Sequence, residues 1–571
     1  MLSCLIWIDA EPLPADLLML HADPLIAELL YRRGIRDEAA ASAFLRKGPS
    51  PAPDLSRMPN LDAAAERVCR AIEAGERIAI FGDYDADGVT STALLVRALH
   101  AASGDPSRVI ARVPTRDEGY GLNQAAIDDF AEAGASLLIA VDCGSSDHER
   151  VAQARSAGLD VVILDHHHMH DAGPAGAVVV SAQLDEDGSY RELAAVGVAY
   201  LLVAALAQHG CPVDGENGDP ETALLDYVAL GTVADVAPLT GANRAMVRDG
   251  LRRMRRAPRE GVKALCRKAG LDPATLTAEQ VSFKIAPRLN AAGRMADPQL
   301  ALDLLLTDDP LQAATLADEI ERLNGARRAE SQRIVREAEQ LIEAQADRDR
   351  RRLLIVRGTG WSSGVLGIAA NQLVSRFGRP VIVLNDDGAQ SRGSARSVPG
   401  FDIVEALTGC AGLLQAHGGH SQAAGLTVVN TNVAALTTAL EDALDASGVE
   451  TPIRPSLRLD AELASDRLTI ETARLLEALQ PFGMGNEQPI FLIRNLRVRQ
   501  YDVMGQDRSH LRLHLAGTRG VTRAVSWGAA ERSRELLTCR AIDVAATLGV
   551  DSWNGQTRLH VEVKDFRPAS Q

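Results

Sequence analysis

The chain has 571 residues, a length that suggests about four compact units and excludes a single small binding module. Hydrophobic residues make up 46% and charged residues 24%, so the chain can form several apolar cores and is not generally disordered. The formal net charge of −16 argues at first against a nucleic-acid partner, although binding depends on where charges lie rather than on their sum.

Targeting signals and cysteine pairs are missing from the sequence. The seven cysteines are scattered and form no C-x-x-C pair, which argues against a disulfide framework and a structural zinc site. The first residues lack the basic and cleavage signals of a secretory peptide, and no apolar run approaches the roughly 18 residues that span a bilayer. We therefore expect a cytoplasmic protein with no membrane association.

The first half of the chain predicts a helical segment, a linker and a parallel sheet. The alternating prolines of 47–54 favour an extended linker, and an amphipathic helix is expected over 61–75. Short apolar runs separated by helical patterns then predict strands that are buried on both faces. These strands are expected at 77–81, 109–113, 136–141, 160–164 and 176–180.

The second half predicts three further parts. A charge-laced helical pattern without proline after 310 indicates a long connecting helix. A second α/β unit follows, with strands expected at 353–357 and 380–384. Strict alternation at 510–515 and 558–563 then predicts strands of a small antiparallel barrel or sandwich.

The expected fold class is therefore α/β, with two α/β lobes joined by a long helix and followed by a small antiparallel barrel or sandwich. The expected boundaries are 1–50 for the N-terminal helical segment and linker, 51–305 for the first lobe, 306–352 for the connecting helix, 353–452 for the second lobe and 453–571 for the barrel or sandwich.

An acidic cluster follows the first predicted strand of the sheet. Asp83, Asp85 and Asp87 are so close in sequence that their charges repel, and such a cluster normally holds a hard cation. An EF-hand would need a glutamate where leucine stands at 94 or 95, so that reading fails. A plain surface turn remains the alternative.

Two more predicted strands end in acidic residues, Asp142 and Asp165, and Asp165 is followed by three histidines. Because the carboxyl ends of parallel strands meet at one rim, these groups are expected to converge there. Imidazole beside carboxylates favours Mn²⁺ or Mg²⁺ over Ca²⁺. Asp235, a lone acid in an apolar segment, is a further candidate ligand. Such a set suits a two-metal phosphoester hydrolase, whereas the histidine run alone could be a solvated loop.

Four motifs in this order carry a resemblance: Gly82–Gly88, Asp142-x-Gly144, Asp165-His-His167 and Gly231–Asp235. With them, the chain resembles the DHH phosphoesterase superfamily and, within it, the RecJ family of bacterial single-strand-specific exonucleases. The resemblance runs from about residue 46 to the end. Later segments resemble the family's second domain, DHHA1, and the start of its C-terminal OB-fold; these are 285–294, 392–397, 417–425 and 481–486.

The resemblance implies roles for individual residues. It implies a cluster for two Mn²⁺ or Mg²⁺ ions formed by Asp83, Asp85, Asp87, Asp142, His166 and Asp235. It implies catalytic roles for His167, Asp142 and His166, with His167 near the scissile phosphate. It implies substrate binding by Arg116, Arg288, Asn290, Arg294, Ser394, Arg396, Gly419 and His420. Departures from the family pattern stand at Cys143, Ser181-Ala182 and Ser362.

The resemblance also implies a function. It implies a monomeric 5′-to-3′ exonuclease that acts on single-stranded DNA, releases 5′-mononucleotides in recombination and repair, and is served by a single-strand-binding protein and a helicase. One alternative is a DHH phosphodiesterase for a small substrate, such as nanoRNA, a cyclic dinucleotide or pyrophosphate. Another is a DNA-binding scaffold that has lost catalysis.

Positive charge gathers in 248–270, where nine basic residues stand against two acidic ones. This clustering predicts a surface that follows a nucleic-acid backbone, with a salt-bridged helix as the alternative. In the barrel region, four aromatic residues could stack on bases, and we expect about half of them to be core instead. These are Phe491, Tyr501, Trp527 and Trp553.

Overall fold

A computed structural model describes residues 5–10, 19–169, 171–186, 188–211, 223–345, 348, 350–553 and 556–569, the side chains of residues 538, 552 and 553 excepted. The chain forms two compact units. One is Ala52–Ile453, and the other joins Met1–Pro51 to Arg454–Gln571. In the ranges that the structure describes, no helix is both long and apolar enough to cross a bilayer.

The first half of the larger unit is built on a five-stranded parallel sheet. Its strands are β2 (Ile78–Phe81), β3 (Val109–Arg112), β4 (Leu137–Val141), β5 (Asp160–Asp165) and β6 (Ala177–Ser181). They lie in the order β3-β2-β4-β5-β6. Every residue of β2 and β4 is buried, as expected for strands covered on both faces. The parallel sheet predicted from the apolar runs is confirmed, and each strand end lies within one residue of its predicted position.

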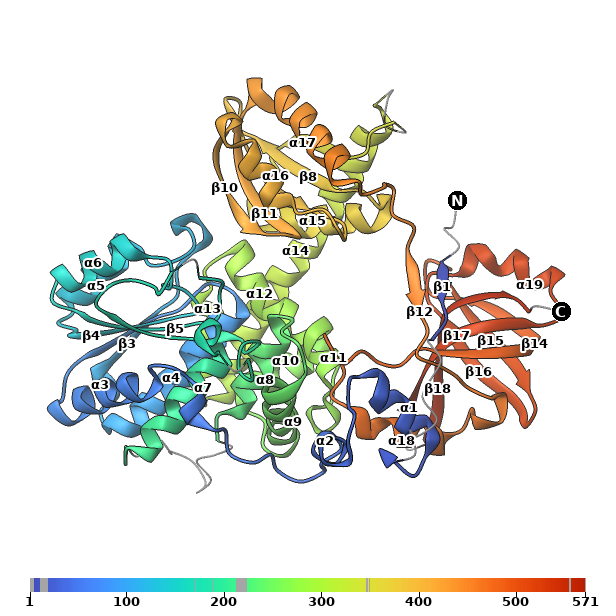
Figure 1. The fold of residues 1–571 in the computed structure, drawn as a ribbon, viewed down its shortest axis with the longest axis horizontal. Helices are drawn as coiled ribbons and strands as arrows, with labels where there is room; N and C mark the ends of the chain where they lie inside the picture. The colour runs from blue at the N-terminus through green and yellow to red at the C-terminus, as the bar shows by residue number, and fades with distance from the viewer. Residues whose placement is uncertain are drawn as a thin grey trace. The chain divides into compact units, whose positions relative to one another are not determined.

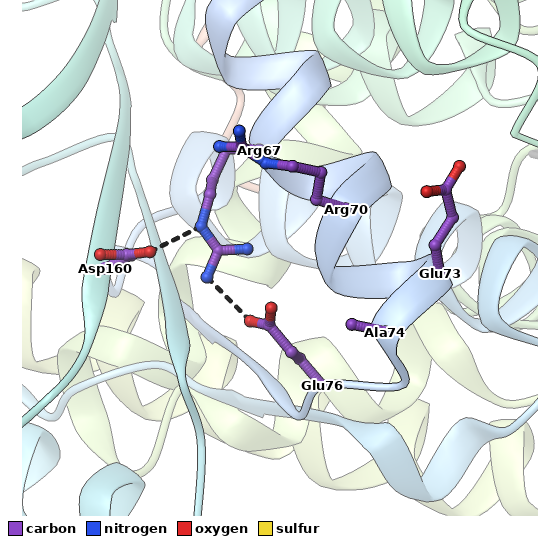
Figure 2. A pocket seen from close by; sticks show the side chains of 6 residues that line it. All are labelled: Arg67, Arg70, Glu73, Ala74, Glu76 and Asp160. Atoms are coloured by element: carbon purple, nitrogen blue, oxygen red, sulfur yellow. Dashed lines mark hydrogen bonds and ion pairs between the residues drawn. The ribbon is translucent and has the colours of Figure 1, made fainter.

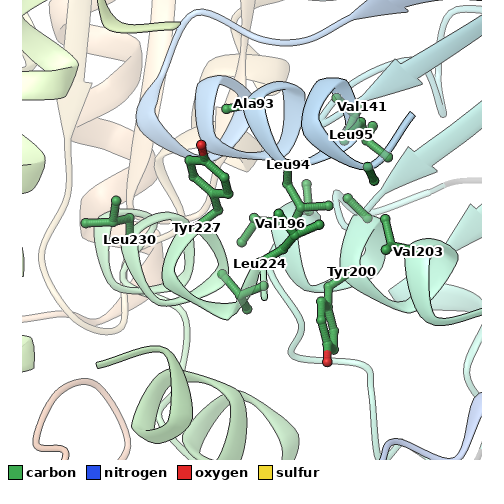
Figure 3. Close-up of a cluster of buried hydrophobic side chains, with 14 of the residues drawn as sticks. Ala93, Leu94, Leu95, Val141, Val196, Tyr200, Val203, Leu224, Tyr227 and Leu230 are labelled. Atoms are coloured by element: carbon green, nitrogen blue, oxygen red, sulfur yellow. The ribbon is translucent and has the colours of Figure 1, made fainter. Parts of the chain in front are cut away.

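Helices cover both faces of this sheet (Figure 1). They are α3 (Leu61–Ala74), α4 (Ala86–Ser103), α5 (Gln124–Glu132), α6 (His148–Ser156), α7 (Ala195–Gln208) and α8 (Leu225–Ala234). Helices α3, α4 and α7 pack on one face, and α5 and α6 on the other. Figure 3 shows α4, α7 and α8 packed through Leu94, Val196 and Tyr227. This buried layer fixes the N-terminal end of α4 and the C-terminal end of α8.

A helical region leads from this lobe to the second one. It contains α9 (Gly241–Arg256), α10 (Glu260–Ala269), α11 (Ala278–Gln280), the π-helix η7 (Val281–Ile285), α12 (Ala286–Met295), α13 (Gln299–Leu306) and α14 (Pro310–Glu343). Asp309 caps α14 and Pro310 occupies its first turn, where a missing N–H has no effect. The long helix lies inside the stretch predicted to connect the lobes.

The second lobe has a mixed five-stranded sheet. Its strands are β7 (Leu354–Thr359), β8 (Val381–Asp386), β9 (Gln390–Arg396), β10 (Leu414–His420) and β11 (Ala423–Val429). They lie in the order β10-β11-β9-β8-β7, and only β7 and β8 are parallel. Its helices are α15 (Ser363–Phe377), α16 (Ile403–Gly409) and α17 (Val433–Ser447). Helices α14 and α15 pack on one face, and α16 and α17 on the other.

The smaller unit contains a closed five-stranded barrel. Its strands are β14 (Phe491–Met504), β15 (His510–Gly517), β16 (Gly520–Ser526), β17 (Ile542–Trp553) and β18 (Gln556–Pro568), with β13 (Ala461–Glu462) beside β14. Pairing of β14 with β17 closes the barrel, which confirms the predicted barrel. Its helices are α1 (Pro24–Arg32), α2 (Glu38–Phe44), α18 (Ile470–Leu476) and α19 (Glu535–Thr538).

The N-terminal segment belongs to the barrel unit, which the sequence did not indicate. Strand β1 (Ile6–Ile8) pairs in parallel with β12 (Ser456–Arg458). The Trp7 indole donates to Asp565 at 2.7 Å, and Arg33 donates to the Asn486 side chain at 2.6 Å. Apolar residues of α1 lie in the same core as the barrel strands. Both ends of the chain therefore build one unit.

The four aromatic residues expected as stacking platforms have different positions. Phe491 is in the barrel core, Tyr501 is half-buried against it, and Trp527 is 53% exposed. The side chain of Trp553 lies outside the described residues.

Most of the basic segment 248–270 is used inside the fold. Arg253 and Arg259 both approach the buried Asp226, with Arg259 at 2.7 Å. Arg252 pairs with Asp249, Lys263 with Glu260, and Lys268 with Asp318. The expected backbone-tracking surface is therefore wrong for these residues, because their charges neutralise acidic partners within the lobe.

A further ion-pair group lies at the amino end of the parallel sheet. Arg67 of α3 donates to Asp160 at 2.7 Å and to Glu76 at 2.8 Å, as Figure 2 shows. Asp160 begins β5, so this group lies at the opposite end of the strand from the acidic motif. We assign it a structural role, because each carboxylate already has its cation.

Candidate active site

The acidic loop after β2 is fixed by helix ends. Asp85 caps α4 and accepts the amide of Asp87 at 2.8 Å. Asp87 is 1% exposed and reaches the first turn of α7, where it accepts the amides of Ala195 at 2.7 Å and Val196 at 3.1 Å. Helix N-termini favour negative charge. The two amides therefore hold this buried carboxyl group at a defined position, although burial, and then the charges of Asp235 and Asp85, raise its pKa well above its usual range.

The ends of β4 and β5 bring the next groups to the same rim. Asp142 has a left-handed backbone with φ of 63°, and the residue is 2% exposed. The Nε2 atom of His166 lies 3.3 Å from Asp142 Oδ1. Asp165 accepts the backbone amides of His166 at 2.8 Å and His167 at 3.2 Å, and so fixes the histidine loop.

Asp235 completes the cluster from the C-terminal end of α8. Its Oδ2 lies 3.9 Å from His166 Nδ1, and Asp87 Oδ2 lies 4.0 Å from His166 Nε2. The structure therefore brings all six predicted ligands together. Together with His167, they form three groups whose ligand atoms lie within 4.8 Å of one another: Asp83, Asp85 and Asp142; Asp87, His166 and Asp235; Asp142, His166 and His167.

The donor set fits divalent cations. Among the described residues, the buried Oδ1 atoms of Asp83 and Asp142 have no hydrogen-bond partner. Burial, and then the charge of Asp85, raises the pKa of Asp83 to about 8; burial and Asp87 raise the pKa of Asp142 well above its usual range. Burial and Asp85 raise the pKa of Asp235 to about 7. Bound cations offset such repulsion, and hard oxygen ligands with an imidazole suit Mn²⁺ or Mg²⁺.

His167 is held at the edge of this cluster. Its Nδ1 lies 2.8 Å from Asp165 Oδ1 and 3.1 Å from the Tyr120 hydroxyl. Burial alone would lower the pKa of His167, but the hydrogen bond and charge of Asp165 raise it to about 9. The ring stacks on His420 of the second lobe, with centroids 6.3 Å apart and planes 14° apart. The two lobes therefore meet at this histidine.

The second lobe contributes the remaining predicted groups from β9 and the β10–β11 hairpin. Arg396 donates to the Ser394 hydroxyl at 2.9 Å, and burial lowers the pKa of Arg396. A Cβ atom at Gly367 of α15 would lie 2.6 Å from the Arg396 guanidinium, so glycine leaves room for it. Gly419 has φ of 142°, a conformation that favours glycine, and it places His420 at the tip of the hairpin.

Guanidinium groups from both lobes gather beside these residues. Burial, and then the charge of Arg116, lowers the pKa of Arg294 to about 10, and Arg327 and Arg396 add to this effect. Arg116 stacks on the Tyr84 ring at 4.2 Å, and its buried Nε has no hydrogen-bond partner among the described residues. Such a cluster of positive charge favours an anion such as phosphate.

Two predicted substrate ligands make contacts within the fold. Arg288 donates to Glu321 at 2.6 Å and to the Lys284 carbonyl at 2.5 Å. The Asn290 amide oxygen accepts the Ala86 amide at 2.8 Å. Asn290 therefore positions the acidic loop and Arg288 ties η7 to α14, while the substrate role expected for each stays a prediction.

Three residues of the site were not among the candidate residues. Asp165 was noted only as an acidic strand end, and its role in fixing the histidine loop depends on backbone contacts. Tyr120 has no motif of its own and reaches Asp142 and His167 only through the fold. Arg327 lies three residues after the buried Asn324 and donates to it at 2.9 Å, a spacing that places both on one helix face.

Comparisons with known proteins agree with this geometry. The N-terminal domain of the DHH family matches residues 77–232, the DHHA1 domain matches 351–446, and the RecJ OB domain matches 459–565. The fold and site thus define a phosphoesterase of the DHH superfamily.

The chain is 35% identical over 551 residues to the single-stranded-DNA-specific exonuclease RecJ of Bacillus subtilis, across 96% of this chain and 68% of that protein. It is 32% identical over 576 residues to Escherichia coli RecJ, across 98% of each. The crystal structure of Thermus thermophilus RecJ with Mn²⁺ has a TM-score of 0.83 at 30% identity and covers 99% of this chain and 80% of that one. The corresponding Mg²⁺ complex has a TM-score of 0.77 at 29% identity, across 99% and 79%. This chain belongs to the RecJ family of single-stranded-DNA-specific exonucleases.

Proposed function

We propose that the protein is a Mn²⁺- or Mg²⁺-dependent exonuclease that degrades single-stranded DNA from its 5′ end and releases 5′-mononucleotides in recombination and repair. The observation that carries this proposal is that an acidic cluster and a basic cluster lie next to each other. A cluster of acidic side chains around His166 lies beside His167, and His167 stacks on His420, where guanidinium groups gather. One surface suits cations and the other suits a terminal phosphate.

The acidic cluster would hold the cations. The proposed ligands are Asp83, Asp85, Asp87, Asp142, His166 and Asp235, with His167 and Asp142 beside the reacting phosphate. When bound, two such cations supply Lewis-acid stabilisation of the phosphoryl oxygens and favour attack by water. The protein holds the ligands in place. For Asp87, this is done by the two backbone amides at the start of α7.

His167 would act as a general acid or base. Its Nδ1–H donates to Asp165, which leaves Nε2 as the nitrogen that gives or takes a proton. With Nδ1 engaged by Asp165, Nε2 is the atom that would exchange a proton with a phosphate oxygen or with the leaving oxygen. Tyr120, hydrogen-bonded to the Asp142 carbonyl at 3.3 Å, limits rotation of the ring.

The second lobe would recognise the 5′ end. Three guanidinium groups lie close enough to repel one another, those of Arg116, Arg294 and Arg396. A terminal phosphate bound among them would offset this repulsion. Ser394, Gly419 and His420 would complete this pocket. The pocket therefore sets the polarity of the reaction, because the 5′ end is held on one side of the acidic cluster.

The barrel would supply a further surface for single-stranded DNA. Trp527 is 53% exposed at the end of β16, and its ring meets His510 edge-on at 4.9 Å. Arg523, on the same side of β16, is exposed and pairs with His514 across the sheet. An exposed aromatic ring with a nearby guanidinium suits a single strand, whose bases stack and whose phosphates carry charge.

The proposal also includes the cellular setting and the division of the chain. We expect a cytoplasmic monomer that receives substrate from a single-strand-binding protein and a helicase. The proposed parts are 1–50, 51–305, 306–352, 353–452 and 453–571, although the contacts of Trp7 and Arg33 assign the first of these to the barrel unit.

A digest of end-labelled DNA tests the proposed function. A single strand labelled at its 5′ end should release labelled mononucleotide at once in Mn²⁺, and blunt duplex should remain intact. Release of label only from the 3′ end would refute the polarity. Hydrolysis of dinucleotides with long strands untouched would instead identify a small-substrate phosphodiesterase.

A further inference from the structure

An exposed aromatic residue precedes helix α12. Phe283 lies at the centre of the π-helix η7 and is 75% exposed. A phenylalanine ring at such exposure loses the favourable burial of its apolar surface, and π-helical turns occur frequently at functional sites. Lys284, the next residue, is also exposed. The structure therefore leaves an aromatic ring and a cationic side chain exposed at consecutive positions.

The π-helical turn is held rigidly. Val281 and Ile285, on either side of Phe283, are fully buried, and the amide of Ala286 donates to the Val281 carbonyl to close the wide turn. Arg288 bonds the Lys284 carbonyl at 2.5 Å and Glu321 of α14 at 2.6 Å. The ring of Phe283 is thus displayed from a fixed backbone, which reduces the entropy lost when a ligand stacks on it.

Helix α12 relates this ring to the site. Asn290 contacts the acidic loop at the Ala86 amide, and Arg294, one turn later, donates to the Gly364 carbonyl of the second lobe at 3.0 Å. Phe283 precedes Asn290 by seven residues, a distance of about 10 Å along a helix. Residues seven apart lie on the same side of an α-helix, and one π turn changes this angle by less than a quarter turn. The order along the helix is therefore the phosphate pocket, the acidic cluster and Phe283.

We propose that Phe283 stacks on a base of the strand on the 3′ side of the cleaved bond, with Lys284 beside the neighbouring phosphate. The inference rests on the proposed function, because a 5′ end in the second lobe directs the rest of the strand toward the start of α12. At roughly 3.4 Å per stacked nucleotide, 10 Å corresponds to about three nucleotides. Stacking tolerates every base, since each has a π face, so Phe283 grips the strand without sequence preference.

A fluorescent base analogue measures this contact directly. Oligonucleotides with 2-aminopurine at successive positions from the 5′ end are bound to the protein in EDTA, where cleavage does not occur. Stacking quenches this base, so quenching should be greatest near the third or fourth position. Phe283→Ala should restore the fluorescence at that position, and Phe283→Trp should keep it quenched. In Mn²⁺, Phe283→Ala should raise KM for a long strand about 5-fold or more and leave kcat for a 5′-phosphorylated dinucleotide unchanged.

Leu311→Ala is the matched control, because Leu311 lies in the same unit, is 79% exposed and should affect neither measurement. Equal quenching in Phe283→Ala and wild type, with equal KM for long strands, would overturn the proposal while the exonuclease activity stands. A wild-type protein that cleaves no single strand would refute the proposed function itself. Loss of quenching in Phe283→Ala, with dinucleotide hydrolysis equal to that of wild type, supports a role in holding the strand. The unchanged dinucleotide reaction shows that the variant is folded.

Discussion

Gly231 in α8 offers a sharp test of how Asp87 is held. A Cβ atom at this position would lie 2.7 Å from Asp87 Oδ1 and 2.8 Å from a Val196 methyl, and it would also strike the Thr90 hydroxyl. Moving either polar neighbour, Asp87 or Thr90, would break hydrogen bonds that hold it in place. Asp87 is bonded to two amides of α7, and the buried Thr90 donates to the Ala86 carbonyl at 2.8 Å. The variant Gly231→Ala must therefore displace the carboxylate.

The magnitude follows from three contributions. Overpacking of a core by one methyl group costs about 1–3 kcal/mol, and loss of a hydrogen bond to a charged group costs about 1.5–3 kcal/mol. Alanine gains about 1 kcal/mol in helix propensity over glycine. We expect the free energy of unfolding of Gly231→Ala to be about 1.5–5 kcal/mol lower than that of wild type. Affinity for Mn²⁺ should fall about 10- to 100-fold, as when a group that orients a metal ligand is lost.

Denaturant unfolding and calorimetric titration with Mn²⁺ measure the two effects. Gly325→Ala in α14 is the matched control, since a Cβ atom there meets nothing within 4 Å. That variant should be more stable by about 0.5–1 kcal/mol and bind Mn²⁺ normally. If Gly231→Ala bound Mn²⁺ as tightly as wild type and cleaved DNA at the same rate, the described placement of Asp87 would be incorrect.

Four further outcomes are expected. Asp142→Ala should lower cleavage about 100-fold or more while single-strand binding in EDTA, measured by anisotropy, stays within twofold; full activity would remove Asp142 from the site. Adding Mn²⁺ at 100 times its Kd should stabilise the native protein by about 2.7 kcal/mol in thermal unfolding, and an unchanged Tm would count against a cation site. Arg396→Ala should abolish the preference for a 5′-phosphate over a 5′-hydroxyl, which competition between the two strands measures. Trp527→Ala should weaken binding of long strands by about 1–3 kcal/mol and leave dinucleotide hydrolysis unchanged, whereas an equal loss for both substrates would refute a role specific to long strands.

Residues whose positions follow from strand ends could be predicted from the sequence. The parallel sheet has a strong signal, because its strands are continuous apolar runs and ligands of such sheets lie at the carboxyl ends. Asp83, Asp142 and His166 each follow such a strand, so their convergence in space needed no knowledge of side-chain geometry. Asp235 lies on a helix instead, and only its apolar surroundings and its motif indicated it.

Residues whose role depends on a partner far away in sequence could not be predicted. Arg288 stands in a motif that suggests substrate binding, but its partner Glu321 comes from another helix, and no local pattern indicates that pair. Part of the basic segment behaves in the same way, since the acid that pairs with Arg259 precedes it by 33 residues. Tyr120 contacts His167 across the rim of the sheet, and a single tyrosine in a loop carries no periodic signal.

The shared unit of the two chain ends has a consequence for synthesis on the ribosome. Trp7 and α1 need β12 and the barrel strands to bury their apolar surface, and the whole of Ala52–Ile453 is made in between. At roughly 5–20 residues per second, these about 400 residues take some 20–80 s, during which the larger unit can fold. The N-terminal segment must stay unpaired and protected from aggregation until then. Nascent chains stopped before the barrel should therefore expose this segment to protease, and released full-length protein should protect it.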